Sequence, residues 1–400
     1  MPDVYFKKTL DFYHNGQAMQ FHVAQDLFSS HQIDVGTARL LHSLDSERSF
    51  HKVLDLGCGY GPLGLTLKKL APQRDVHLID RDALAVDYTR QNAAFNGIAD
   101  VSVYGSLGYD DVTARDFDLI ISNIPGKAGE AVITSLLRDA GHVLAPGGMV
   151  AIVVVAPLAE LVTNALADPD IDVIFQETRS GHAIFHYQFS AAYHERWPAP
   201  ESAFARGLYH RDNVTMSTAK VTYAMQTARG LPEFDSLDFT SALLFKGLID
   251  VRGKRVNRAL VFNPGQGHLP VVLWKLAQPR QIDLVDRDLL SLRYTQANLI
   301  LNKCPDARIA TQHRVGLPDA EPTPQTDLIA GFLREEEGQA AAGLMLQQAA
   351  VLLVPGGDLW IAAGSTAVTR VEKLAQADKA FRVEKRKRDR GKSLLVLRRR

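Results

Sequence analysis

The chain of 400 residues contains an internal repeat, and this repeat limits the folds that it can adopt. At an offset of 206 residues, Asp80-Arg81-Asp82 matches Asp286-Arg287-Asp288. At an offset of 209, Leu144 to Gly148 (LAPGG) matches Leu353 to Gly357 (LVPGG). Further matched pairs are Tyr88-Thr89 with Tyr294-Thr295, Asn92 with Asn298, Asn96 with Asn302, and Asp118-Leu119-Ile120 with Asp327-Leu328-Ile329. Matches that keep their spacing over a long stretch indicate a duplicated domain.

The connection between the two copies is expected near residues 190 to 205. The segment Trp197 to Ser202 (WPAPES) has the proline content and polarity of a linker. A chain of this length can form two domains of ordinary size. We therefore predict one domain over residues 1–195 and a second over residues 205–400.

Composition and charge exclude several classes of protein. Apolar residues make up 46% and charged residues 22% of the chain, as is typical of folded globular domains. The 45 basic and 45 acidic residues balance, which excludes a uniformly basic nucleic-acid coat, although Phe381 to Arg400 carries ten basic and two acidic residues. Only Cys58 and Cys304 are present, and we find neither a signal peptide nor an apolar run of about 18 residues. These features predict a cytoplasmic protein without disulfides or membrane segments.

In the first copy, short apolar runs alternate with helix-like segments. The expected strands are Lys52 to Leu56, Val76 to Ile79, Val101 to Tyr104, Leu119 to Ser122 and Met149 to Val155, and the expected helices are Pro62 to Leu70, Ala83 to Phe95 and Glu130 to Val143. Two final strand-like runs, Val173 to Thr178 and Ala183 to Phe189, predict a terminal antiparallel hairpin. This pattern is typical of an α/β fold, so we predict two tandem Rossmann-like domains, each with a mostly parallel, doubly wound sheet that ends in a hairpin.

A glycine-rich loop, Gly57 to Gly64 (GCGYGPLG), follows the first expected strand. Glycine lets a backbone turn sharply and approach a ligand, and the N-terminus of the next helix points at that ligand. Gly59, Gly61 and Gly64 also satisfy the dinucleotide pattern G-x-G-x-x-G, so NAD is one alternative ligand. Another alternative is a glycine-rich turn without a ligand, with Asp80 as the cap of the next helix.

Three residues around this loop suit S-adenosylmethionine (SAM), and the first two favour it over NAD. Asp55 lies two residues before Gly57, where a carboxylate repels a pyrophosphate but attracts the ammonium group of a methionyl moiety. Pro62 removes one N–H donor that a phosphate would use. Asp80, at the end of the second strand, can accept hydrogen bonds from two ribose hydroxyls, in SAM as in NAD.

The fourth expected strand leads into Ser122 to Lys127 (SNIPGK). Ligands of an open α/β sheet bind outside the carboxyl ends of its strands, so Asn123 is expected to face the same crevice as the glycine loop. An exocyclic amine is a weak nucleophile. The oxygen of Asn123 and a backbone carbonyl made rigid by Pro125 can hold its N–H groups and direct its lone pair at a sulfonium methyl. The alternative is a turn in which Asn123 caps a helix.

These motifs define a predicted site at one edge of the first sheet. The residues predicted to bind the cofactor are Asp55, Gly57, Cys58, Gly59, Gly61, Asp80, Arg81, Ser106 and Asn123. The predicted catalytic residues are Asn123 and Pro125. We expect no metal, because no two His, Cys or acidic residues show ligand spacing beside a glycine-rich turn.

Several motifs together resemble those of class I SAM-dependent methyltransferases, and among these the two-domain bacterial enzymes that methylate guanine N2 in ribosomal RNA. The motifs are Asp55 to Gly61 (DLGCGYG), Asp80, Asn92 to Gly97 (NAAFNG), Ile121 to Pro125 (ISNIP), and the upstream segments Leu27 to Ser30 and Ile33 to Leu41. The resemblance extends from about Phe21 to Phe189 and weakly over the second copy. It implies SAM as the cofactor, guanine N2 of ribosomal RNA as the acceptor, and packing of the upstream segments over the cofactor.

The chain departs from this family in two respects. The family motif is usually Asn-Pro-Pro-Phe, with an aromatic ring that stacks on the target base, whereas Ile124 and Gly126-Lys127 stand at those positions here. The family also tends to place its active domain second. Here the second copy has Val261 for Asp55, Asn263 for Gly57, Pro264 for Cys58, and Phe332 and Arg334 for Asn123 and Pro125, while Asp286 keeps the ribose position. We expect this copy to bind substrate or to support the first domain, without catalysis.

The basic C-terminal segment has two interpretations. Its Lys and Arg residues can contact RNA phosphates, or they can charge the exposed face of a terminal hairpin and so protect an edge strand. For the whole chain, the leading hypothesis is methylation of guanine N2 in ribosomal RNA. The alternatives are a non-catalytic SAM- or RNA-binding protein with a degenerate motif, and a methyltransferase for a non-RNA amine or amide nitrogen. The sequence assigns no oligomeric state.

Overall fold

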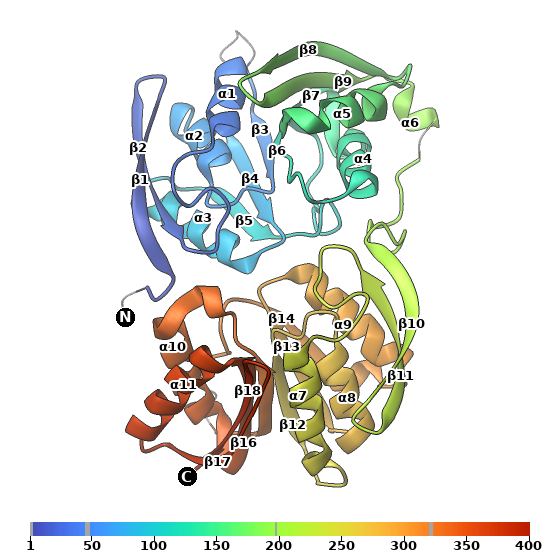
Figure 1. The fold of residues 1–400 in the computed structure, drawn as a ribbon. Coiled ribbons are helices and arrows are strands. Elements are labelled where there is room, and N and C mark those ends of the chain that lie inside the picture. The colour runs from blue at the N-terminus through green and yellow to red at the C-terminus, as the bar shows by residue number, and fades with distance from the viewer. Residues whose placement is uncertain (1–2, 45–48, 197, 320–322) are drawn as a thin grey trace. The chain divides into compact units, whose positions relative to one another are not determined.

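The computed structural model describes residues 3–44, 49–196, 198–319 and 323–400 (Figure 1). The chain divides into two compact units. One unit is Phe6–Tyr209, and the other is His210–Arg400 together with Asp3 to Tyr5. Asp3 to Tyr5 therefore group with the second copy of the repeat rather than with the first.

The first unit continues beyond the expected linker, of which Trp197 lies outside the described residues. The backbone N–H groups of Ala203 and Phe204 donate to the Asp110 carboxylate at 2.6 and 3.1 Å. Arg206 also forms an ion pair with Asp139. These contacts fasten the segment before Tyr209 to the first unit.

The first unit alternates strands and helices as its sequence predicts (Figure 1). Its strands are β1 (Phe6–His14), β2 (Gln17–Ala24), β3 (Lys52–Leu56), β4 (Asp75–Asp80), β5 (Val101–Gly105), β6 (Phe117–Asn123), β7 (Leu144–Val155), β8 (Ile171–Arg179) and β9 (His182–Phe189). Its α-helices are α1 (Val35–Ser43), α2 (Pro62–Leu70), α3 (Ala83–Phe95), α4 (Glu130–Arg138), α5 (Ala159–Leu166) and α6 (Tyr193–Arg196). The helix expected over Glu130 to Val143 ends at Arg138 and continues as the 3-10 turn Asp139–His142.

Seven of these strands form one sheet, in the order β5-β4-β3-β6-β7-β9-β8. Strands β3 to β7 pair in parallel, whereas β9 pairs antiparallel with both β7 and β8. The predicted fold class, a mostly parallel sheet that ends in an antiparallel hairpin, is confirmed. In this order β3 and β6 are neighbours although they are not consecutive, which creates the switch point where α/β sheets bind ligands.

The two faces of the sheet carry different helices. Leu54 of β3 and Ile152 of β7 lie in a buried cluster with Ile133 of α4 and Val162 of α5. The opposite face of β3 carries Asp55, which contacts α2, because side chains alternate along a strand. The helices α1 and α2 cover this second face. The predicted cofactor residue Asp55 lies on it.

A small antiparallel hairpin, β1 and β2, precedes the sheet and was not expected from the sequence. Two asparagines of the repeat hold it. The backbone N–H of His22 donates to Asn92 Oδ1 at 2.7 Å, and that of Gln20 donates to Asn96 Oδ1 at 3.0 Å. The side-chain amides return bonds to the carbonyls of His22 and Gln20 at 3.0 and 2.7 Å. The last turn of α3 and its C-cap residue therefore hold the hairpin through two side-chain amides.

The second unit repeats this architecture. Its strands are β10 (His210–Thr218), β11 (Val221–Ala228), β12 (Arg258–Phe262), β13 (Gln281–Asp286), β14 (Ile309–His313), β15 (Thr326–Phe332), β16 (Leu353–Gly364), β17 (Phe381–Asp389) and β18 (Lys392–Arg399). Its α-helices are α7 (Phe239–Leu248), α8 (His268–Ala277), α9 (Leu289–Leu301), α10 (Gly338–Leu352) and α11 (Ser365–Ala377). Its seven-stranded sheet has the order β14-β13-β12-β15-β16-β18-β17, which is the order of the first sheet.

Matched residues of the repeat form equivalent contacts in the two units. Asn298 and Asn302 exchange amide bonds with the backbone of β11, as Asn92 and Asn96 do with β2. Asp327 Oδ2 accepts the N–H groups of the first residue of β12 and of the residue before it, and Asp118 Oδ2 accepts the equivalent pair at β3. Some of the residues that the two copies share therefore stabilise the fold. Among the described residues, no helix is long and apolar enough to span a membrane.

Candidate active site

The glycine loop is fastened to β4 by its backbone. The N–H groups of Gly57 and Cys58 both lie 2.9 Å from the Ile79 carbonyl oxygen, and the N–H of Gly59 lies 2.9 Å from Asp80 Oδ2. Gly57 and Gly59 have φ angles of 75° and 59°, which favour glycine. A Cβ at either glycine would meet no atom within 4 Å. One side of the loop is therefore fixed and the other is open, as a ligand cradle requires.

The helix α2 begins directly after this loop. Gly61 precedes it with a φ of 93°, and Pro62 is its first residue, as predicted. The N–H of Gly64 donates to Asp55 Oδ2 at 2.8 Å. A Cβ at Gly64 would lie 3.0 Å from Asp55 Cβ and 2.7 Å from Leu78 Cδ2. Gly64 therefore allows the first turn of α2 to rest on the sheet beside Asp55.

Asp55 is a fully buried acid at the base of the loop. Its Oδ2 accepts the Gly64 N–H, whereas its Oδ1 finds no hydrogen-bond partner among the described residues. Burial raises the pKa of Asp55 to about 7, and the charge of Asp80 adds to the rise while the Gly64 bond opposes it. A buried carboxylate oxygen without a donor fits the ammonium group of SAM, the ligand expected for this residue.

Asp80 lies at the end of β4 and faces the loop. Its two carboxylate oxygens accept the N–H groups of Gly59 and Asp82, each at 2.9 Å. Each carboxylate oxygen can accept more than one hydrogen bond, so capacity remains for ribose hydroxyls. Burial raises the pKa of Asp80, and the charge of Arg81 is among the influences that lower it. The helix cap belongs to Asp82 rather than to Asp80, because Asp82 Oδ1 accepts the N–H of Leu84 at 2.9 Å.

Two other predicted cofactor residues use their side chains within the protein. The Ser106 hydroxyl donates to the Gly108 carbonyl at 2.7 Å, while its backbone N–H bonds the carbonyl of Asp80 at 2.9 Å. The Cys58 sulfur lies 3.5 Å from Thr89 Oγ1. Burial raises the pKa of the Cys58 thiol well above its usual value, which keeps it neutral. That Ser106 or Cys58 contacts a cofactor stays a prediction. Such a contact would use the backbone, because both side chains are engaged within the protein.

Asn123 ends β6, next to β3 in the sheet. Its Nδ2 donates to Asp34 Oδ2 at 2.9 Å and to Thr37 Oγ1 at 3.1 Å. A carboxylate only accepts hydrogen bonds, so the amide nitrogen must face Asp34 and the oxygen must face the other way. The next helix, α4, begins at Glu130 and has Gly129 as its N-cap residue, so Asn123 is not its cap, which was the alternative.

The residues after Asn123 lack the aromatic ring of the related motif. Ile124 is buried in the α4–α5 side of the core, and its N–H bonds the Val153 carbonyl at 3.0 Å. The Pro125 carbonyl accepts the N–H of Ala128 at 3.0 Å and closes a turn. Pro125 thus fixes the backbone next to Asn123, and the motif itself supplies no ring for stacking on a base.

Asp34 and Thr37 were not among the predicted site residues, although their segment was expected to cover the cofactor. Asp34 caps α1 by accepting the N–H of Thr37 at 3.0 Å. An Asp directly before an apolar helical segment indicates this cap. It does not reveal the contact with Asn123, which lies 89 positions from Asp34.

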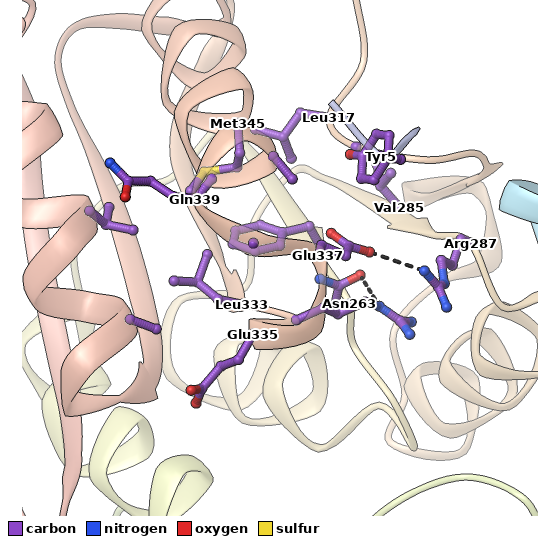
Figure 2. A pocket seen from close by; sticks show the side chains of 18 of the residues that line it. Tyr5, Asn263, Val285, Arg287, Leu317, Leu333, Glu335, Glu337, Gln339 and Met345 are labelled. Carbon is purple, nitrogen blue, oxygen red and sulfur yellow. Dashed lines mark hydrogen bonds and ion pairs between the residues drawn. The ribbon is translucent and has the colours of Figure 1, made fainter. Parts of the chain in front are cut away.

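The equivalent edge of the second unit is filled by its own side chains (Figure 2). Arg334 lies 2.7 Å from Asp286 Oδ1 and 3.2 Å from Asn263 Oδ1. The Ser291 hydroxyl donates to Asp286 Oδ2 at 2.6 Å. Figure 2 also shows Glu337 facing Arg287, which lies 3.2 Å away. The cavity that remains holds about 70 Å³, far below the roughly 300 Å³ of a small ligand pocket.

Similarity to known proteins agrees with this arrangement. Residues 18–168 match the family model described as methyltransferase small domain. The protein YbxB of Bacillus subtilis is 34% identical over 143 residues, which make up 35% of this chain and 71% of YbxB. The chain belongs to the methyltransferase small domain family. The family resemblance inferred from the sequence is therefore confirmed.

Two further proteins are similar to this methyltransferase small domain protein. The ribosomal RNA small subunit methyltransferase C of Pseudomonas entomophila is 40% identical over 131 residues, which are 32% of this chain but only 39% of that relative. A solved structure described as T. thermophilus 16S rRNA N2 G1207 methyltransferase (RsmC) in complex with AdoMet and guanosine has a TM-score of 0.68 at 17% identity, with 98% of each chain covered. This likeness extends the shared fold to both copies of the repeat.

Proposed function

We propose that this chain is a SAM-dependent methyltransferase whose first unit methylates an exocyclic amine, guanine N2 of ribosomal RNA. The observation that carries the proposal is the fixed amide of Asn123 beside an open glycine cradle. Its Nδ2 is held by Asp34 and Thr37, so its oxygen is directed to where an acceptor amine would bind. The names of the relatives support ribosomal RNA as the substrate class.

The chain's own residues provide the expected contacts for the cofactor, which supplies a methyl group on a sulfonium. Asp80 would accept the ribose hydroxyls, the loop around Gly57 and Gly59 would lie against the ligand, and Asp55 would face the methionyl ammonium. The open Cβ sides of both glycines and the unpartnered Asp55 oxygen fit such a ligand. NAD fits less well, because Asp55 and Pro62 both disfavour a pyrophosphate.

The role of Asn123 is to orient the acceptor. Its oxygen and the neighbouring backbone carbonyl would accept the two N–H groups of the amine, so that the nitrogen lone pair points at the methyl carbon. The nitrogen–carbon bond then forms as the sulfur–carbon bond breaks. The methylated nitrogen loses one proton to solvent afterwards, and no general base is needed before transfer. Since Ile124 is buried, a ring that stacks on the base must come from another segment.

The second unit would serve binding or support rather than catalysis. Its counterpart of Asp80 is bonded by Arg334 and Ser291, and Phe332 stands in place of Asn123. The predicted basic hairpin is formed by β17 and β18, but several of its charges are already paired within the unit. Arg386 pairs with Glu372, Lys385 with Asp250 and Arg398 with Asp358. RNA contact there stays a proposal.

The test is transfer of labelled methyl groups from SAM to ribosomal RNA stripped of its modifications, followed by mass mapping of the product nucleosides. We expect label in N2-methylguanosine. Calorimetric titration with SAM and with NAD in parallel separates the cofactor classes, and heat with NAD alone would overturn the assignment. Binding of SAM without transfer to RNA would favour the non-catalytic alternative. Label in an added amine or amide substrate, but not in RNA, would favour a methyltransferase for a non-RNA amine or amide nitrogen.

A further inference from the structure

We propose that Asp34 and Thr37 are positioning residues for the methyl transfer, which act by locking the rotation of the Asn123 amide. The inference rests on the proposed function. It assigns a role to the segment upstream of the first parallel strand that goes beyond packing over a cofactor. Neither residue touches the reacting atoms, because both contact the amide nitrogen of Asn123, on the side away from its oxygen.

The hydrogen bonds define one orientation of the amide. An Asn side chain can turn its oxygen and nitrogen around with little change in shape, so its direction depends on its partners. Asp34 Oδ2, at 2.9 Å, accepts a proton from Nδ2 and would repel the oxygen. Thr37 Oγ1, at 3.1 Å, accepts the second proton. With both protons engaged, the oxygen stays on the side of the acceptor, and no reorientation is required when the substrate binds.

The same oxygen of Asp34 joins the lock to the helix. Asp34 Oδ2 also accepts the backbone N–H of Thr37 at 3.0 Å, so one atom both caps α1 and holds Asn123. The cap fixes the side chain of Asp34 relative to the first turn of α1, and the first turn carries Thr37. The two groups that hold the amide are therefore rigidly related to each other.

Close packing brings this first turn to the end of β6. A Cβ at Gly36 would lie 2.8 Å from Asp34 Oδ2, 2.8 Å from His182 Cδ2 and 3.1 Å from Val153 Cγ2. Gly36 therefore allows α1 to approach β7 and β9 more closely than a residue with a side chain could. Both strands belong to the half of the sheet that begins with β6.

The far end of α1 is tied to the terminal hairpin. Arg39 lies 2.6 Å from Glu177 of β8, and the Ser43 hydroxyl lies 2.8 Å from His186 Nε2 of β9. The hairpin thus braces the helix that orients Asn123. The antiparallel end of the sheet therefore helps to hold the Asn123 amide in position.

The decisive variants separate the cap from the lock. In Asp34→Asn, one amide oxygen can replace Oδ2 in both of its bonds. In Asp34→Ser, a good helix cap remains, but the shorter side chain no longer reaches Asn123. Thr37→Val removes the second acceptor at nearly constant volume. The matched control is Asp238→Ser, because Asp238 caps α7 by accepting the Ser241 N–H at 2.7 Å in the second unit, where Phe332 replaces the catalytic asparagine.

Steady-state methyl transfer and SAM affinity are measured for each variant. We expect Asp34→Ser to lower kcat by about tenfold, the order of one charge-assisted hydrogen bond, with the SAM dissociation constant and the RNA KM changed less than about twofold. Asp34→Asn and Asp238→Ser should stay within about threefold of the wild type, and Thr37→Val should lie between. In an Asn123→Ala background, Asp34→Ser should cause no further loss, because the lock has nothing to hold.

The outcomes separate the inference from the proposed function. If the wild type transfers methyl groups and Asp34→Ser matches it, the positioning role is overturned while the proposed function stands. An equal loss in Asp34→Asn and Asp34→Ser overturns it as well, because it points to the charge rather than to the bond. If the wild type transfers no methyl group to RNA, the proposed function fails and the inference falls with it.

Discussion

The guanidinium of Arg334 lies 2.7 Å from the carboxylate of Asp286, which is the counterpart of Asp80 in the first copy. Both acids end the second parallel strand of their sheet, and both accept the backbone N–H of an Asp two residues later. The second copy has thus retained the acid and paired it with a cationic side chain. Divergence of the two copies is visible as an internal ion pair where a cofactor would bind.

This relationship predicts one SAM molecule per chain. The second site has Arg334 on its acid and a remaining cavity of about 70 Å³, so an adenosyl group cannot enter without displacing that pair. Isothermal titration of the full chain should give a stoichiometry of one. Asp80→Asn should weaken this binding by at least about tenfold, and Asp286→Asn should leave it unchanged. Two equivalents of bound SAM would contradict the occupied site.

Arg334→Ala should destabilise the second unit. The Asp286 side chain is 1% exposed and that of Arg334 is 25% exposed, so the variant leaves a buried carboxylate without its cation. Such a loss costs about 3 kcal/mol in the free energy of unfolding. As a control, Arg211→Ala breaks a pair whose partners are 37% and 63% exposed, and it should cost at most about 1 kcal/mol. Urea unfolding monitored by circular dichroism compares the two, and equal losses would refute the argument.

Much of the first sheet could be predicted because turn residues mark its elements. The bounds of β3, α2 and α3 match the prediction residue for residue, since Gly57, Pro62 and Asp82 punctuate the apolar runs. The β1–β2 hairpin was missed even though Asn15-Gly16 connects its strands with φ angles of 45° and 79°. An Asn-Gly pair of this kind is a strong hairpin signal. The strands of this hairpin alternate exposed and buried residues, so they lack the continuous apolar runs that indicate buried parallel strands.

The site was predictable only in part. The glycine loop and Asp80 are neighbours through β3 and β4, which adjoin in the sheet, so the motifs on them indicated their meeting. The contact between Asp34 and Asn123 joins an upstream helix to β6. No periodic pattern in the sequence predicts such a contact, because it depends on how closely α1 packs against β7 and β9. The ion pair between Asp286 and Arg334 was not predictable either, because the two residues lie 48 positions apart in the sequence.

Asn123→Ala should strongly reduce methyl transfer and retain the cofactor. The variant removes the oxygen that orients the acceptor, which should lower kcat by about a hundredfold or more, whereas SAM affinity should change less than about twofold. Asn96→Ala is the control for loss of an amide in the same unit, because Asn96 holds β2 rather than the site. It should alter stability more than transfer. A fully active Asn123→Ala enzyme would show that another residue orients the amine.

Asp55 predicts how the first unit depends on pH. Its pKa is raised from its usual 3.8 to about 7 by burial, so the folded chain holds a proton that the unfolded chain releases above about pH 4. The free energy of unfolding of the ligand-free protein should therefore fall as pH rises from about 4 to about 7, by at most about 1.4 kcal/mol per pH unit. SAM affinity should change in the opposite direction and rise through pH 7, because only the ionised carboxylate attracts an ammonium group.

Asp55→Asn keeps an oxygen for the Gly64 N–H and should remove the pH dependence of both the free energy of unfolding and the SAM affinity. Denaturant unfolding and SAM titration at pH 5, 6, 7 and 8, on wild type and variant, measure the difference. Parallel pH profiles of the two proteins would exclude Asp55 as the titrating group.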